Sequence, residues 1–170
     1  MIYYLDDELD ESELMIAIEN KDYALLKKLL HSGIDPYFVN KFGTTAVSNA
    51  CMNGDLESLK ILHENGVDIN KIILNADIPI IKACLTGNIK LVDYLVKYGA
   101  NLNSVDNLGR TPLMNAIIYK NIKVIQYLLM DLSIDFYILD RFNKIAFYYA
   151  LIGIPDKFNI EVLYMLYLII

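Results

Sequence analysis

The sequence is poor in the residues from which catalytic and metal sites are usually built. Only two cysteines and two histidines occur among 170 residues, and there is no tryptophan. His31 and His63, with Cys51 and Cys84, do not have the spacing of a zinc-binding Cys/His set. No serine or cysteine has a base at a recognisable spacing, and no glycine-rich phosphate loop occurs. We therefore expect no catalysis, no metal and no cofactor.

Long apolar runs are also missing. The run from residue 145 to 154 is stopped by Pro155 and Asp156, and no run reaches the ~18 residues that a membrane-spanning helix needs. The first residues lead directly into Asp6, Asp7 and Glu8, unlike a secretory signal. Together with the low cysteine content, this predicts a cytoplasmic protein in a reducing compartment, without a membrane segment.

A basic excess is absent as well. The formal net charge is -6, which disfavours nucleic acid as the main partner because phosphate binding needs a concentrated basic surface. A protein partner more basic than this chain fits better. Residues 1–11 are predicted to form an acidic arm, which either favours the N-terminus of the next helix through its dipole or docks a basic partner.

What the sequence does contain is a repeat with a period of thirty-three residues. Residues 45–50, 78–83 and 111–116 fill the same slots. Pro79 and Pro112 begin predicted helices, where the first-turn amide has no hydrogen-bond partner to lose. A fixed period of this length indicates a repeat array rather than an enzyme domain.

Each period is predicted to form two short helices followed by a turn. In the first period, Ser12 is expected to cap a helix over residues 13–20, and Asp22 a second helix over residues 23–31. Gly33 then ends the second helix, in a slot where a left-handed backbone favours glycine.

Two segments of this repeat carry a recognisable motif. Residues 106–113 and 99–103 resemble the pattern of the ankyrin-repeat family, with its Thr-Pro-Leu helix start and its Gly-Ala-Asp-x-Asn turn. The resemblance implies an all-α repeat solenoid, in which stacked helix-turn-helix pairs are joined by β-turn or hairpin fingers. It also implies a non-catalytic protein–protein interaction module. The replacement of the family histidine is expected to weaken one local hydrogen bond per repeat. The residues that replace it here are Ser48, Ile81, Met114 and Tyr148.

The resemblance covers residues 12–170 and predicts five repeats after the acidic arm. Their expected bounds are 12–39, 40–72, 73–105, 106–139 and 140–170. The fourth repeat gains one residue near position 132, and the fifth inserts roughly four residues between its helices. Terminal repeats are often atypical because they cap the stack.

The two cysteines occupy identical slots in successive repeats. Stacked helices place Cys51 and Cys84 roughly 10 Å apart, beyond the ~7 Å Cα separation that a disulfide allows. We expect two buried, unpaired thiols.

In proteins of the resembled family, the turn tips and one face of each first helix line a concave groove. The corresponding residues here are Lys41, Phe42, Met52, Asn53, Leu74, Asn75, Lys82, Leu85, Asn107, Leu108, Arg110, Ile118, Tyr119, Arg141 and Phe142. Exposed aromatic residues beside arginine dominate interface energetics, so Phe42, Tyr119 and Phe142 are expected to anchor a partner. The alternative is that the tip residues pack on one another as part of the fold, namely Phe42, Leu74, Leu108 and Phe142.

The last segment offers a different surface. Val162 to Ile170 is apolar on every side, whereas a capping helix usually shows water a polar face. The segment is an irregular buried cap, a weak homodimer surface, or the end of a shortened array.

Three biological uses fit these features. The first is an adaptor or effector that acts on host proteins in the host cytoplasm, and the second is an immunity protein that neutralises a basic toxin such as a nuclease. The third is a structural protein that self-assembles through its apolar last helix. The abundance of Ile, Asn and Tyr, with more lysine than arginine, is typical of AT-rich genomes such as those of some bacteria and large DNA viruses.

Overall fold

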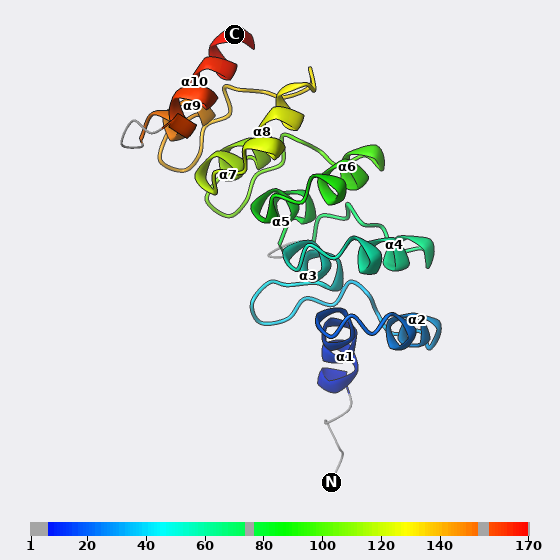
Figure 1. Ribbon diagram of the computed structural model, residues 1–170. Coiled ribbons are helices and arrows are strands. Elements are labelled where there is room, and N and C mark those ends of the chain that lie inside the picture. Colours follow the sequence, from blue (N-terminus) through cyan, green and yellow to red (C-terminus); the bar gives the residue numbers. More distant parts are fainter. Residues whose placement is uncertain (1–6, 74–76, 153–156, 170) are drawn as a thin grey trace.

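The computed structural model describes residues 7–73, 77–152 and 157–169, with side chains from residue 13 to 168 within these ranges. The regular structure of this part is entirely helical and consists of ten helices in five pairs (Figure 1). Their bounds are α1 (Asp7–Glu19), α2 (Tyr23–His31), α3 (Ala46–Met52), α4 (Leu56–Glu64), α5 (Pro79–Thr86), α6 (Ile89–Lys97), α7 (Pro112–Ile118), α8 (Ile122–Leu129), α9 (Ala146–Leu151) and α10 (Lys157–Ile169).

The pairs are stacked in chain order from one terminus to the other (Figure 1). The first helices of the pairs form an inner row, in which α1 packs on α3, α3 on α5, α5 on α7 and α7 on α9. The second helices form an outer row, in which α2 packs on α4, α6 on α8 and α8 on α10. The main contacts therefore run between successive pairs, as in a solenoid, and the predicted all-α repeat architecture is confirmed.

The first pair agrees with the sequence in its second helix but not in its first. The Asp22 side chain accepts a hydrogen bond from the amide of Leu25 at 2.9 Å, and Gly33 has a φ of 91°, both as predicted. However, α1 begins at Asp7, so Ser12 lies inside the helix and the predicted cap is wrong. No glycine or proline interrupts the acidic run, and its carboxylates favour a helix N-terminus through the dipole. Helix therefore extends into the predicted arm.

The helix that begins after Thr45 keeps the local hydrogen bond that was expected to be weak without the family histidine. The Thr45 amide donates to Ser48 Oγ at 2.8 Å, and the Ser48 amide donates to Thr45 Oγ1 at 3.1 Å. The expectation is therefore wrong at Ser48, because a serine hydroxyl accepts this bond. At the equivalent place the Thr111 amide faces Met114 Sδ at 3.4 Å, and sulfur is a weak acceptor.

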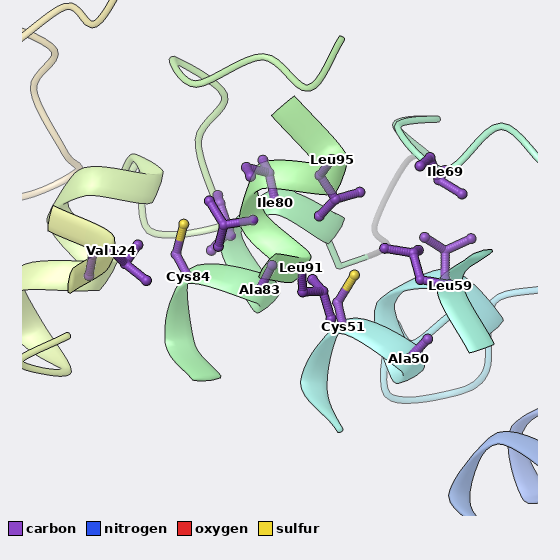
Figure 2. Close-up of a cluster of buried hydrophobic side chains, with 14 of the residues drawn as sticks. Ala50, Cys51, Leu59, Ile69, Ile80, Ala83, Cys84, Leu91, Leu95 and Val124 are labelled. Atoms are coloured by element: carbon purple, nitrogen blue, oxygen red, sulfur yellow. The ribbon is translucent and has the colours of Figure 1, made fainter. Parts of the chain in front are cut away.

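The core runs through all five pairs. Small side chains on the inner helices let the two rows approach closely, and each is at most 1% exposed, namely Ala17, Ala50, Ala83, Ala116 and Ala150. Large aliphatic residues of the outer helices fill the space between successive pairs, as Figure 2 shows for Leu59, Leu91 and Leu95. The removal of this apolar surface from water stabilises the stack.

Both cysteines belong to this core. Cys51 and Cys84 lie on successive inner helices (Figure 2), and both are buried and unpaired, as predicted. Burial raises the pKa of each thiol, and the proximity of Cys84 raises that of Cys51 further. The two thiols therefore behave as small apolar side chains rather than as nucleophiles.

Asparagine side chains tie successive pairs together. Asn121 Nδ2 donates to the carbonyls of Cys84 and Leu85 at 2.7 and 2.9 Å, and Asn88 Nδ2 donates to that of Gly54 at 2.8 Å. These bonds satisfy backbone oxygens at the ends of inner helices, which have no partner within the helix.

The last pair is less regular than the others. The inserted segment predicted near residues 153–159 lies partly outside the described residues. In α10, Val162 and Leu166 are buried, whereas Tyr164 and Tyr167 are exposed. The helix thus has one face in the core and apolar side chains on the other. None of the described helices is long and apolar enough to span a membrane.

Candidate protein-binding surface

Three turns between pairs share one hydrogen-bonded geometry. We call them finger 1 (residues 40–44), finger 3 (residues 106–110) and finger 4 (residues 140–144). In each, the amide of the first residue donates to the carbonyl of the fifth, and the amide of the fourth donates to the carbonyl of the first. The described fingers contain no strand, so they are tight turns rather than hairpins.

A side-chain oxygen of the first residue fixes the tip of each finger. It accepts hydrogen bonds of 2.8 to 2.9 Å from the amides of the third and fifth residues, and it belongs to Asn40, Asp106 or Asp140. Such bonds are typical of asparagine and aspartate in turns. The third residue of each finger therefore takes an equivalent place, and these residues are Phe42, Leu108 and Phe142.

The tip residues point away from the fold. Phe42 is 76% exposed and Phe142 is 63% exposed. This exposure favours the interpretation of Phe42 and Phe142 as anchors over the alternative that the tip residues pack on one another. Leu74 and Asn75, which were predicted to be turn-tip residues, lie outside the described residues. In the sequence, Ile73 stands where the three fingers have asparagine or aspartate.

Backbone hydrogen bonds link a finger to the segment one repeat further along at two places. The Arg141 amide donates to the Leu108 carbonyl at 2.9 Å, and the Asp77 amide donates to the Gly43 carbonyl at 2.7 Å. A Cβ added at Gly109 would lie 3.0 Å from backbone atoms of finger 4. Fingers 3 and 4 are therefore held at a fixed spacing, which preorganises their tips for a partner.

A central hollow of about 220 Å³ opens between α5, α7 and finger 3. Its apolar lining consists of Ile78, Ile81, Leu85, Leu108 and Tyr119, and its polar lining consists of Asp77, Lys82, Asp106, Asn107, Arg110 and Asn115. The structure thus brings together six of the residues predicted to contact a partner, namely Lys82, Leu85, Asn107, Leu108, Arg110 and Tyr119.

The cations of the central hollow are already paired. Lys82 Nζ lies 2.9 Å from Asp77 Oδ1. Arg110 Nη2 and Nε each lie 2.9 Å from Asp106 Oδ2, which also accepts a hydrogen bond from Asn115. The rim is therefore electrically balanced, and the hollow suits an apolar side chain surrounded by polar contacts.

A second, N-terminal hollow lies between α1 and finger 1. It has a volume of about 440 Å³ and is lined by Met15, Ile16, Glu19, Phe38, Asn40, Lys41 and Phe42. Lys41 and Phe42 were predicted from the sequence, whereas Ile16 and Phe38 were missed. A signal existed for Ile16, because helical periodicity places it away from the core face that contains Leu14 and Ile18.

The other predicted residues lie along the same surface without forming one pocket. Met52 and Asn53 are exposed at the end of α3, and Ile118 is half-buried at the end of α7. Arg141 and Phe142 are exposed at finger 4 and line neither hollow. The candidate surface is therefore extended, and a partner that contacts both Phe42 and Phe142 must cross three repeats.

Finger 4 is anchored to α9 by a phenol–carboxylate contact. Tyr149 donates a hydrogen bond to Asp140 Oδ2. Burial, followed by this hydrogen bond, raises the pKa of Tyr149 to about 12. Burial opposes ionisation of Asp140, but the bonds from Tyr149 and from the amides of Lys144 and Phe142 outweigh it and lower the Asp140 pKa. The charged carboxylate therefore stabilises the finger.

Comparison with protein families explains this arrangement of fingers and helix pairs. A family model described as "Ankyrin repeats (3 copies)" matches residues 14–77 and 50–140, which together span more than half of the chain. The chain belongs to the ankyrin-repeat family. Ankyrin repeats generally mediate protein–protein interaction. A search of curated proteins gave no match.

The negative charge of this ankyrin-repeat chain is concentrated at one end. Six of its 21 acidic residues lie between residues 6 and 13, where there is no basic residue. The rest of the chain has 15 acidic and 15 basic residues. The acidic excess therefore precedes the row of fingers. Among the described residues, no group of three or more His, Cys, Asp or Glu could hold a metal ion.

Proposed function

We propose that this chain binds a partner protein along the surface made by its fingers and inner helices. The observation that carries the proposal is the set of exposed apolar tips, Phe42, Leu108 and Phe142, on turns that share one hydrogen-bonded geometry, two of which are also hydrogen-bonded to each other. Aromatic side chains that are exposed and held in place lose little conformational entropy on binding, so they serve as anchors. Tyr119, beside the central hollow, supplies a further anchor.

The partner is expected to combine apolar anchors with a basic segment. Its apolar side chains enter the central and N-terminal hollows, where the walls are partly aliphatic and the charges are balanced. Its basic segment lies toward residues 6–13, where carboxylates attract cations at long range and accelerate encounter.

An affinity capture from lysate of the source cells, read by mass spectrometry, tests the proposal. The bait is the wild-type chain or a Phe42→Ala/Tyr119→Ala/Phe142→Ala variant. Each truncation should weaken binding by about 1 to 4 kcal/mol, so a specific partner is lost with the variant. A matched control replaces exposed side chains beyond α8 in a Met130→Ala/Leu132→Ala/Tyr137→Ala variant. Partners retained by the first variant, or lost equally with the control, would contradict the proposal.

A second candidate function is self-association through residues 162–170. It is favoured by the exposure of Tyr164, Tyr167 and Leu168 on α10, since a helix that shows apolar side chains to water is often covered by a partner. Sedimentation equilibrium of the wild-type chain tests it, because self-association makes the average mass rise with concentration.

A further inference from the structure

The last helix pair exposes positions whose counterparts in the preceding pair are buried. The repeat register relates α7 to α9 by thirty-four residues and α8 to α10 by thirty-eight, and this places Val162 and Leu166 opposite Val124 and Leu128, all four of which are buried. In the same register, Leu151 of α9 corresponds to Ile117 of α7. It therefore gives each position of the last pair a counterpart inside the stack.

Four positions differ sharply from these counterparts. Leu151 is 54% exposed where Ile117 is 2% exposed, and Tyr167 is 77% exposed where Leu129 is 8% exposed. Tyr148 is also exposed where Met114 is buried, and Leu163 is half-buried where Ile125 is buried. We call the surface made by Tyr148, Leu151, Leu163 and Tyr167 the end face.

The end face has the composition of the interface between repeats. Its counterparts are covered because α9 packs on α7 and α10 packs on α8, and no described residue covers the end face in the same way. Ile160, Tyr164 and Leu168 extend it along the exposed side of α10. Such spacing gives a helix an apolar stripe that suits packing against another helix.

The opposite end of the stack is built differently. Lys28 is exposed where its counterpart in the second pair, Ile61, is buried. Glu13 is half-buried where Ala46 is buried. Charged residues thus replace core residues at the N-terminal end. A head-to-tail contact between two copies would remove these charges from water against apolar side chains, which is costly.

We propose that two copies of this chain associate tail to tail through their end faces. This inference rests on the self-association proposed above, and it adds the α9 residues Tyr148 and Leu151 to the surface. Because the same face serves both copies, the contact is isologous and closes at a dimer. The central and N-terminal hollows lie on earlier pairs of the stack and stay available in each copy.

Sedimentation of the full chain and of two single variants tests the proposal. The wild-type mass should rise from 19.4 kDa toward twice that value with concentration and then stop. Leu151→Glu and Tyr167→Glu should each raise the dissociation constant by at least about tenfold. Both positions are exposed within one chain, so circular dichroism and melting temperature should stay unchanged.

Two controls address charge and geometry. Met130→Glu adds the same charge at an exposed apolar side chain of the outer row, where the preceding repeats have Lys97 and Glu64. Lys28→Glu alters the opposite end. Neither should change the dissociation constant.

Each contrary result has a distinct meaning. A wild-type chain that stays at one chain's mass would overturn both self-association and the end-face dimer. Association that is indifferent to Leu151→Glu and Tyr167→Glu would leave self-association standing but overturn the end face as its surface. Growth beyond two chains, or weakening by Lys28→Glu, would overturn the tail-to-tail arrangement.

Discussion

The amide of Arg141 and the carbonyl of Leu108 form a 2.9 Å hydrogen bond that joins finger 3 to finger 4. The contact is possible because the residue that follows Leu108 in finger 3 is a glycine, Gly109, with a φ of 77°. A Cβ at this position would lie 3.0 Å from Asp140 Cα and from the Arg141 nitrogen. Real Cβ atoms rarely approach backbone so closely, so the two fingers would have to separate.

Gly109→Ala should therefore destabilise the protein by about 2 to 3 kcal/mol, through backbone strain together with the displaced finger. Gly66→Ala is a matched control, since Gly66 also has a positive φ of 85° but nothing within 4 Å of an added Cβ. It should cost only about 1 kcal/mol. Urea unfolding of the two variants measures the difference, and equal losses would show that finger contact is unimportant.

The groove anchors should be dispensable for folding. Phe42, Tyr119 and Phe142 are exposed, whereas Leu95 is 0% exposed in the core. Each single replacement of an anchor by alanine should change the free energy of unfolding by less than about 1 kcal/mol. Leu95→Ala leaves a cavity and should lower it by about 2 to 5 kcal/mol. Thermal or urea unfolding of single variants checks this. A loss at Phe42 comparable to that of Leu95→Ala would make Phe42 a core residue.

The repeat period was sufficient to predict the stacked pairs because the same structural requirements recur in each repeat. The prolines at the start of α5 and α7, the glycine after α2 and the buried alanines each satisfy a local constraint that is visible in the sequence. The predicted start of α1 was wrong because it rested on Ser12 as the cap. The acidic run before it can itself be helical, since its carboxylates favour a helix N-terminus through the dipole and no glycine or proline interrupts it.

The candidate surface was only partly predictable for a different reason. Periodicity identified which residues occupy finger tips and inner helix faces, so six of them meet in the central hollow. It did not reveal that Lys82 and Arg110 are paired with Asp77 and Asp106. It also did not show that Phe42, at the tip of finger 1, lines a hollow, whereas Phe142, at the tip of finger 4, lines neither hollow. These are distances between side chains, and a periodic pattern does not specify them.

Asp140 should make the stability of finger 4 depend on pH in the acidic range. Its pKa is lowered in the folded chain, so its stabilising contribution is present above the unfolded pKa of about 3.9 and is lost as the pH falls through the folded value. Asp140→Asn keeps a turn-closing oxygen, as Asn40 does in finger 1, but removes the charge. The stability difference between wild type and variant should be largest near neutral pH and should vanish in strong acid. Urea titrations at several pH values measure it, and a difference that is independent of pH would contradict the charge argument.

The cysteines should be protected from thiol reagents while the protein is folded. Cys51 and Cys84 are both buried, and burial raises the pKa of each thiol, so little thiolate is present near neutral pH. Ellman's reagent should detect no rapidly reacting thiol in the native chain and both thiols in denaturant. Met130→Cys provides a positive control, because this side chain is 82% exposed. One fast-reacting thiol in the native wild type would show that a repeat opens readily.

Asn121 should couple the third and fourth pairs more strongly than its polar character suggests. Its Nδ2 donates to two carbonyls at the end of α5, those of Cys84 and Leu85. Asn121→Ala leaves these partly buried acceptors without this donor and should cost about 1 to 3 kcal/mol. Asn65→Ala is a suitable control, since Asn65 Nδ2 donates to Ile61 in its own helix and is exposed.

The two asparagine variants should also differ in how the protein unfolds. A solenoid unfolds as one unit only while the interface between neighbouring pairs is strong relative to the stability of each pair. Removal of the Asn121 bonds weakens one such interface, so the slope of the urea transition should fall because the two halves of the stack separate. Asn65→Ala should shift the midpoint slightly at an unchanged slope. An unchanged slope in Asn121→Ala would mean that apolar contacts between α5 and α7 are sufficient to couple the halves.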